Sequence, residues 1–342
     1  MTHALLAEIA KDLKARVGDS PTLKSYTDWE IYRRHLYSAM EVIAVTPVVT
    51  MGAAKITEAT IDGRGSWELA RLHSEVLTKG FVVEPTGSIN VVEIPASRGL
   101  VAETVEARLS SDGVTMIRLR EQEASMRSTY LKLVAEENVK HTLQLHVETG
   151  ISGADYLVID LEALSGSNIS LQVFTQPGQM TRILARTRVS RKASLGQVFA
   201  SLSTKGTRLD AVLDTVVYGS SPSAIVNGRI IGLGGFAALR GVGRVSRDSE
   251  EARLVYGFEA LMLSEDTRAF MHPFMEVYGN KVQEARHYAK TTVVTEDMLF
   301  YLATRGLAEE EARRMITRGI VVKGFENPLR HVLVSVLESL GV

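Results

Sequence analysis

The chain has 342 residues, of which 45% are hydrophobic and 23% are charged, and its formal net charge is −1. This composition is ordinary for a globular protein, and the near-zero charge gives no bulk attraction to nucleic acid or to a membrane surface. The absence of cysteine excludes disulfides, thiolate zinc sites, cysteine nucleophiles and iron–sulfur clusters held by thiolates of this chain alone.

The N-terminal region lacks the patterns of export and of membrane insertion. Met1 to Gly18 alternates apolar and charged residues and has no apolar core of a signal peptide. The most apolar run, Ala39 to Ala54, is interrupted by Glu41 and Pro47, so it does not read as a transmembrane span. We therefore expect a cytoplasmic location.

Two helices are predicted near the N-terminus. Apolar residues have helical spacing over residues 4–17 and again from Trp29 to Met40. Residues 41–80 are ambiguous, and we expect a mixture of helix and strand there.

From about residue 80 to 280 the sequence is typical of many short strands. Apolar residues alternate with polar ones in several segments, with these on one face: Leu157, Ile159, Leu161 and Ala163; Ile169, Leu171 and Val173; Leu209, Ala211, Leu213 and Val217; Leu254, Tyr256, Phe258, Ala260 and Met262. A period of two predicts half-buried strands. Their spacing suits a sandwich, a barrel or a β-solenoid, and periodicity alone leaves all three open.

Helices return from Thr295 onward. Thr295 is placed to cap a helix that begins at Glu296, and Gly306 stands where a glycine ends a helix. Glu309, Glu310 and Glu311 then open a second helix at the end where the dipole favours acidic residues. Pairs with Arg313 and Arg314 one turn later add about 0.3 kcal/mol each. A third helix is predicted from Pro328 to Leu340.

Motifs of catalytic or cofactor sites are weak. "GLGGFA", Gly232 to Ala237, has the spacing of a dinucleotide-binding loop, but Gly241 and Gly243 break the helix that must follow, so a glycine-rich strand corner is favoured. His146 and Glu148 share one face of a strand, which is short of a three- or four-ligand metal site. His272 is expected in a turn before Pro273. No nucleophile–base constellation is evident from spacing.

Four short motifs near the C-terminus carry a family resemblance. They are PFMEV at 273–277, HYA at 287–289, LFYLATRG at 299–306 and EARRMI at 311–316. In this order and spacing they resemble the C-terminal signature of the SufB/SufD family, the core proteins of the SUF machinery for iron–sulfur cluster assembly. The similarity extends over about residues 190–320.

The resemblance implies a mainly β fold, a right-handed parallel β-helix with N-terminal and C-terminal helical segments. It suggests an N-terminal helical or mixed region (1–80), a β-helix core (81–285) and a C-terminal helical region (286–342). Members of the family pair through the last β-coils, and their C-terminal helices dock SufC, an ABC-type ATPase. The docking residues implied here are Leu299, Phe300, Tyr301, Arg305, Gly306, Glu309, Glu310, Glu311, Arg314 and Met315. An apolar ridge of Leu299, Leu302, Met315 and Ile316 is expected to anchor these helices to the solenoid end.

Departures from the family pattern shape the expected role. SufB-type chains have a cysteine where Phe258 stands here, and some have another where Ala285 stands, so this chain cannot accept a persulfide. The histidine used by SufD-type chains at the interface is kept as His287, here expected at a strand end. The resemblance thus implies a non-catalytic, SufD-like scaffold that pairs with a SufB-like chain, or the sole core protein of a reduced system, which forms a homodimer.

A transient iron–sulfur cluster at the dimer interface is the cofactor that this role implies. Weak candidate ligands or interface residues are His287, Glu259 and Glu284, and flavin binding is left open. Two rival readings are a structural β-solenoid adaptor and a β-solenoid carbohydrate-active enzyme. The enzyme calls for a secretion signal and for acidic residues clustered on one face, and neither is evident.

Overall fold

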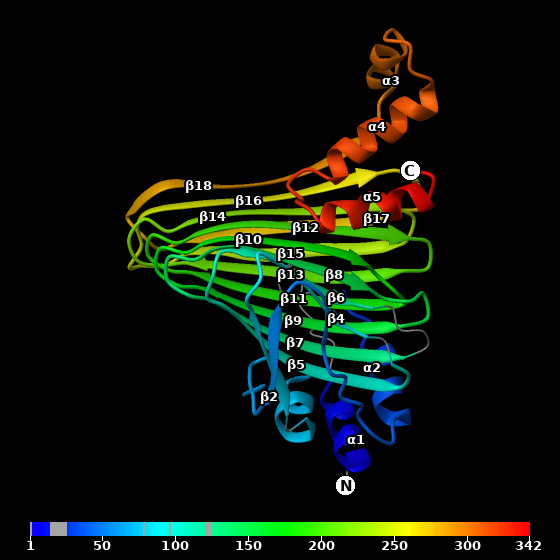
Figure 1. The fold of residues 1–342 in the computed structure, drawn as a ribbon. Helices are drawn as coiled ribbons and strands as arrows, with labels where there is room; N and C mark the ends of the chain where they lie inside the picture. The colour runs from blue at the N-terminus through cyan, green and yellow to red at the C-terminus, as the bar shows by residue number, and fades with distance from the viewer. Residues whose placement is uncertain (1, 14–25, 78, 96, 121–124) are drawn as a thin grey trace.

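The computed structural model describes residues 2–13, 26–77, 79–95, 97–120 and 125–342. Within these residues the chain is wound into a β-solenoid with helices at both ends (Figure 1). From β3 onward, successive strands alternate between two stacked sheets, and each strand pairs in parallel with the strand two places later in the chain. The first two strands pair antiparallel, β1 with β4 and β2 with β3. The mainly β fold class, with a solenoid and terminal helices, is therefore confirmed.

We call the two sheets A and B, and each has nine strands in the described part of the chain. Sheet A has the order β17 (Arg268–Val277), β15 (Phe236–Val245), β13 (Arg208–Val217), β11 (Met180–Val189), β9 (Ala154–Ala163), β7 (Met126–Ala135), β5 (Leu100–Leu109), β3 (Gly80–Pro85) and β2 (Ala54–Ala59). Sheet B has the order β1 (Val48–Met51), β4 (Ile89–Ile94), β6 (Gly113–Leu119), β8 (Lys140–Glu148), β10 (Asn168–Gln176), β12 (Ser194–Thr204), β14 (Ser223–Leu233), β16 (Glu250–Met262) and β18 (Lys281–Val293).

Helices lie at the two ends of the chain. They are α1 (Thr2–Asp12), α2 (Trp29–Ser38), a π-helical turn η1 (Leu72–Val76), α3 (Glu296–Ala303), α4 (Glu309–Val321) and α5 (Leu329–Ser339). The two predicted N-terminal helices are confirmed as α1 and α2, although residues 14–17 of the first prediction lie outside the described residues. Residues 41–80 contain β1, β2 and η1, the expected mixture. No helix of the described segments is both long and apolar enough to cross a membrane.

The core lies between the two sheets and is built from the alternating residues. Every apolar residue predicted to share a face belongs to this buried cluster or, for Met262, packs against it. Burial of one face of each strand favours this arrangement, because apolar surface contributes about 25 cal/mol for each Å² removed from water. The three-part division of the chain stays a prediction; β18 crosses its second boundary and ends at Val293.

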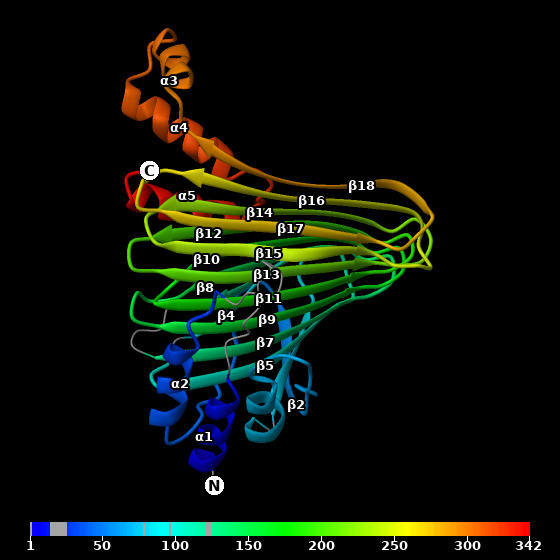
Figure 2. The same cartoon turned by 180° about the vertical axis from the view of Figure 1, so that it is seen from behind.

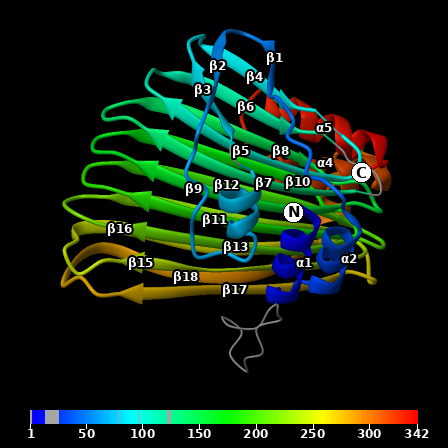
Figure 3. The same cartoon turned by 90° about the horizontal axis from the view of Figure 1, so that it is seen from below.

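The outer faces of both sheets are covered in part. The N-terminal helices α1 and α2 pack on sheet A through a cluster that joins Trp29 and Tyr32 to Tyr156 and Met180 (Figure 3). Tyr32 donates a hydrogen bond to the Asp155 carbonyl oxygen at 2.6 Å, which fixes α2 on the sheet. At the other end, α5 packs on sheet B.

The glycine-rich motif is a strand corner, as predicted. Leu233 ends β14 and Phe236 begins β15, with Gly234 and Gly235 between them at φ values of 101° and 83°. Only glycine adopts such angles without strain, and a Cβ atom on Gly235 would lie 2.2 Å from the Thr204 carbonyl oxygen. The motif is thus explained by chain reversal.

Candidate functional site

The last coil leaves one end of the solenoid open. Strands β17 and β18 end sheets A and B, with no further strand beyond them in the described chain (Figure 1). In contrast to the preceding strand β16, whose interior residues are buried, β18 is largely exposed. The prediction that His272 lies in a turn is wrong, since it lies within β17 opposite Arg240.

His287 stands at the open end of an interior row of side chains. Register places it beside Tyr256, which follows Val226, Gln197, Leu171 and Leu143 from strand to strand. His287 was expected at a strand end, but it lies in the middle of β18. That expectation failed because the segment has no turn signal, and β18 runs on through thirteen residues.

Phe258 fills the position that the resemblance gives to a SufB-type cysteine. Its side chain is fully buried in the core, and its ring contacts that of Tyr256 at 5.3 Å between centroids. On one side it faces Gly228, where a Cβ atom would lie 2.8 Å from the phenyl ring. This position therefore contributes packing, because the ring occupies space that a larger neighbour would need.

Glu259 and Glu284 do not join His287 in one cluster. Both lie on the outer face of sheet B, whereas His287 belongs to the row on the interior face. Glu259 pairs with Lys290 at 2.8 Å, and Glu284 pairs with Arg253 at 2.6 Å. Their positions are six residues apart in the register, about 20 Å along the strand.

The pKa values of both carboxyl groups reflect these partners. For Glu259, burial raises the pKa, but hydrogen bonds from Lys290 and Thr292 outweigh burial and lower it overall. For Glu284, the hydrogen bond from Arg253 is the main cause of a lowered pKa. Both are charged, paired surface residues. Across the described residues, no three His, Asp or Glu side chains converge as a metal site would need.

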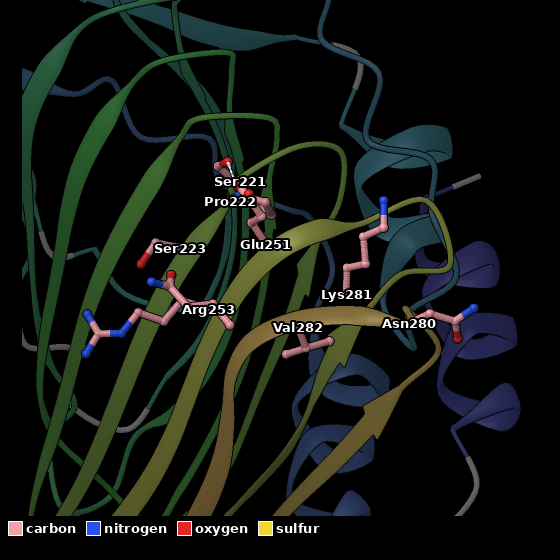
Figure 4. Close-up of a pocket in the computed structure, with 9 residues that line it drawn as sticks. Ser221, Pro222, Ser223, Glu251, Arg253, Asn280, Lys281 and Val282 are labelled. Carbon is pink, nitrogen blue, oxygen red and sulfur yellow. Dashed lines mark hydrogen bonds between the residues drawn. The ribbon is translucent and has the colours of Figure 1, made fainter.

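A shallow hollow of about 660 Å³ lies at the corner where β18 begins (Figure 4). Its lining comes from the starts of three neighbouring strands, and it includes Ser223, Arg253 and Lys281. The charges there are already paired, since Lys281 contacts Glu250 at 3.1 Å and Arg253 contacts Glu284. The hollow is thus a feature of the pairing edge with no evident chemistry of its own.

Beyond β18 the chain forms a helical arm, which we define as α3 and α4 (Glu296–Val321). Figures 1 and 2 show the arm reaching past the edge of the sheets. Thr295 caps α3 as predicted, its Oγ1 accepting a hydrogen bond from the Met298 amide at 3.4 Å. Gly306 ends the helix with φ at 86°. Only two residues, Val294 and Thr295, separate the arm from β18.

The glutamate run opens α4, and its two predicted ion pairs are present. Glu309 contacts Arg313 at 3.3 Å and Glu310 contacts Arg314 at 3.9 Å. The candidate docking residues differ in exposure: Phe300 is 72%, Tyr301 59% and Met315 50% exposed, whereas Leu299 is buried. The arm therefore presents apolar side chains that nothing in the described chain covers.

The arm is anchored by residues other than the predicted ridge. The apolar cluster that packs on sheet B contains none of the four residues of the predicted ridge, Leu299, Leu302, Met315 and Ile316. That cluster joins the end of α4 and α5 to the sheet through Val321, Val322, Phe325, Leu329, Leu333 and Leu337. The ridge prediction was wrong because the chain turns back after α4, and this return segment supplies the contact.

Two glutamines on sheet B hold the start of α5, and sequence reasoning missed them. The Gln144 amide donates to the Glu326 carbonyl oxygen at 2.8 Å and its oxygen accepts from the Leu329 amide at 3.0 Å. The Gln172 oxygen accepts from the Glu326 amide at 2.9 Å. The two glutamines are neighbours on adjacent strands of sheet B. An alignment of the sequences of successive coils is the signal that would have placed them side by side.

Comparison with known proteins agrees with this geometry. Residues 106–320 match the family described as "SUF system FeS cluster assembly, SufBD core domain". An iron–sulfur cluster assembly SufBD family protein of Staphylococcus aureus (strain USA300) is 33% identical over 102 residues, which are 30% of this chain and 22% of that protein. A SufBD family protein of Staphylococcus saprophyticus shows the same identity and coverage.

The chain thus covers 22% of the length of these curated relatives, while the family match spans more than half of the chain itself. It includes most of the solenoid and the helical arm. The chain belongs to the SufBD family of the SUF system for iron–sulfur cluster assembly.

Proposed function

We propose that this chain is a non-catalytic core subunit of a SUF-type iron–sulfur cluster assembly complex in the cytoplasm. It docks a SufC-like ABC ATPase through the helical arm and pairs through its last β-coil. Family membership supports this role. The observation that carries it is an arm of two short helices that extends past the solenoid with its apolar side chains uncovered.

The docking surface combines exposed apolar residues with arginines. Phe300 and Tyr301 lie on α3 and Met315 on α4, and contiguous exposed apolar groups of this kind mark interaction sites. Beside Met315, a groove of about 520 Å³ lies between α4 and α5. Its lining is Leu307, Glu311, Arg314, Met315, Arg318, Gly319, Val322, Arg330 and Val334. An apolar floor with an arginine rim fits an ATPase surface that offers apolar and acidic side chains.

Cluster chemistry in this proposal is shared with other chains. Because the chain has no cysteine, it contributes shape and a pairing edge, while thiolate ligands for a transient cluster come from elsewhere. Of the residues of this chain, His287 is the one we propose as a cluster ligand, because it is exposed on β18, the strand at the pairing edge. Glu259 and Glu284 serve that edge as charged interface residues.

Deletion of everything from Thr295 onward is a poor test of docking. It also removes α5, which covers apolar residues of sheet B such as Phe174, Leu202 and Ile231. A loss of ATPase binding by the truncated chain then cannot be distinguished from a loss of its folding. Point changes on the arm separate them.

The test is a pull-down of the SufC-like ATPase by the Phe300→Ala/Tyr301→Ala variant. We expect at least a tenfold loss of affinity, because large aromatic side chains dominate interfaces of this kind. Ile151→Ala is the matched control, since Ile151 is also 72% exposed but lies in the turn after β8. Unchanged binding by the double variant, with a normal circular dichroism spectrum, contradicts docking through the arm.

A further inference from the structure

A row of side chains on the outer face of sheet B leads from β18 to the base of the helical arm. Register places Lys290 of β18 beside Glu259 of β16, and Glu259 beside Arg229 of β14. The same row continues through Ala200 and Phe174, which belong to the apolar cluster that holds the end of α4 and α5. The charged part of the row therefore ends where the arm is anchored.

Arg229 holds the segment that follows the arm, residues 322–328, which we call the return segment. Its Nη1 donates a hydrogen bond to the carbonyl oxygen of Lys323, two residues past the end of α4. The return segment lies close to the sheet there, since a Cβ atom on Gly324 would lie 3.0 Å from the Val198 side chain. The hydrogen bond from Arg229 is thus made at the point where the arm joins the solenoid.

The guanidinium of Arg229 is largely withdrawn from water, with 8% of its side chain exposed. Burial lowers its pKa, and the nearby Glu259 and Tyr288 oppose that effect. A buried cation requires acceptors in the protein, because it has lost those that water supplies. Two acceptors lie near Arg229, the Lys323 carbonyl oxygen and the Glu259 carboxylate.

Glu259 is held toward β18 rather than toward Arg229. Its Oε1 contacts the Lys290 ammonium at 2.8 Å and accepts a hydrogen bond from Thr292 at 3.0 Å. Its Oε2 lies 3.9 Å from the Arg229 Nε, which is too far for a hydrogen bond. Arg229 is therefore bonded to the return segment and only loosely paired with Glu259.

We propose that Arg229 is a positioning residue for the helical arm and that Lys290 controls it through Glu259. When Lys290 is removed, or is engaged by an acidic group from outside the chain, Glu259 loses its charged partner on β18. Glu259 then turns to Arg229, which releases the Lys323 carbonyl oxygen. This inference rests on the proposed docking through the arm and deepens it by naming the residues that regulate the arm. We call Lys290, Glu259 and Arg229 the relay.

The state of the relay affects the proposed docking surface. The groove beside Met315 is lined in part by Val322 and Arg330, and the return segment connects these two residues along the chain. A loosened return segment weakens binding, because a surface that is already ordered loses less conformational freedom when a partner binds. We therefore expect release of Lys323 by Arg229 to lower the affinity for the ATPase.

Hydrogen exchange of the chain by itself, followed by mass spectrometry, tests the relay without a partner. In the return segment the amide of Phe325 donates to the Val322 carbonyl oxygen, and the amide of Glu326 donates to Gln172. We expect Lys290→Ala to raise the exchange rate of these amides at least about fivefold, the lower end of typical couplings between sites. The affinity for the SufC-like ATPase is expected to fall by a similar factor.

Two variants of the same strand serve as controls. Lys290→Arg keeps a cation that can pair with Glu259, so it is expected to restore slow exchange in the return segment. Arg286→Ala also removes an exposed cation from the outer face of β18. Arg286 pairs with Glu284 at 2.9 Å, which lies outside the relay, so this change is expected to leave the return segment as it is.

A double variant separates the relay from a local weakening of β18. Glu259→Gln removes the charge that draws Arg229 away from Lys323. In that background Lys290→Ala is expected to cause no further exchange in the return segment. A purely local effect of Lys290 on the strand adds to that of Glu259→Gln instead.

Two outcomes overturn the proposal. One is an unchanged exchange rate in the return segment of Lys290→Ala. The other is an increase that persists undiminished when Glu259→Gln is also present. Failure of the proposed function looks different: if exchange depends on the relay as expected, but the Phe300→Ala/Tyr301→Ala variant still binds the ATPase, the role of Arg229 is supported and only docking through the arm is contradicted.

Discussion

At the scale of single residues, the interior of the solenoid holds a carboxyl group that titrates near neutral pH. Glu103 lies on β5, is fully buried, and accepts a hydrogen bond from Thr129 at 2.9 Å. Its other carboxyl oxygen has no hydrogen-bond partner in the described chain. Burial raises the pKa of Glu103 from 4.5 to about 7, and Arg127 offsets this only in part.

This raised pKa predicts a pH-dependent stability. Because the folded state holds the proton more tightly than the unfolded state, the stabilising effect of protonation is complete below pH 4.5. It is lost as the pH rises through 7. The shift from 4.5 to about 7 corresponds to about 3 kcal/mol at most.

Glu103→Gln is therefore expected to melt at a higher temperature than the wild type at pH 8 and at nearly the same temperature at pH 5. Thermal unfolding followed by circular dichroism gives both values. Glu58→Gln, an exposed change on β2, serves as the control and is expected to behave alike at both pH values. A difference for Glu103→Gln that does not vary with pH argues against this titration.

Two other buried residues form a matched pair with opposite expectations. Gln144 uses its amide group to hold the start of α5, whereas both polar atoms of the buried Gln197 lack a hydrogen-bond partner in the described chain. Removing a bonded polar group leaves its partners unsatisfied, at a cost of about 1–3 kcal/mol, while replacing an unsatisfied one by an apolar group is stabilising or neutral.

We expect Gln144→Leu to lower the melting temperature and Gln197→Leu to leave it unchanged or raise it. Hydrogen exchange adds a local measurement, in which Gln144→Leu increases exchange in α5 and leaves the solenoid strands protected. Equal destabilisation by both variants contradicts the distinction between bonded and unbonded glutamines.

At the scale of elements, periodicity predicted the strands and their buried faces but could not place one strand beside another. Alternation identified residues such as Leu171 and Leu213 as core, because side-chain direction in a strand depends only on local geometry. The register steps from Asn168 to Ser194 and from Ser194 to Ser223, so coil length varies along the chain. Because the repeat length varies, periodicity alone does not reveal a solenoid. The solenoid was predicted from the family resemblance instead.

The candidate site was predictable to a similar extent. Capping by Thr295 and the helix end at Gly306 follow from local rules. The positions of His287, Glu259 and Glu284 on different faces depend on the register of β18 against β16, which no local signal contains. The anchoring of the arm by Phe325 and α5 is a long-range contact of the same kind.

At the scale of the whole molecule, two surfaces lie near one end of the solenoid. In the chain, only Val294 and Thr295 separate β18 at the open edge from the helical arm, and the end of α4 is also anchored on sheet B. A force on the arm therefore acts close to the pairing edge. This adjacency gives a physical basis for coupling between ATPase docking and pairing of the core, both of which belong to the proposed function.

The most direct measurement is the molar mass of the chain by light scattering after size-exclusion chromatography, alone and with its SufC-like ATPase. The proposed core subunit is expected to elute as a homodimer and then to take up two ATPase subunits, one on each arm. The Phe300→Ala/Tyr301→Ala variant is expected to stay dimeric and to take up none. A chain that stays monomeric and leaves the ATPase in a separate peak contradicts the proposal.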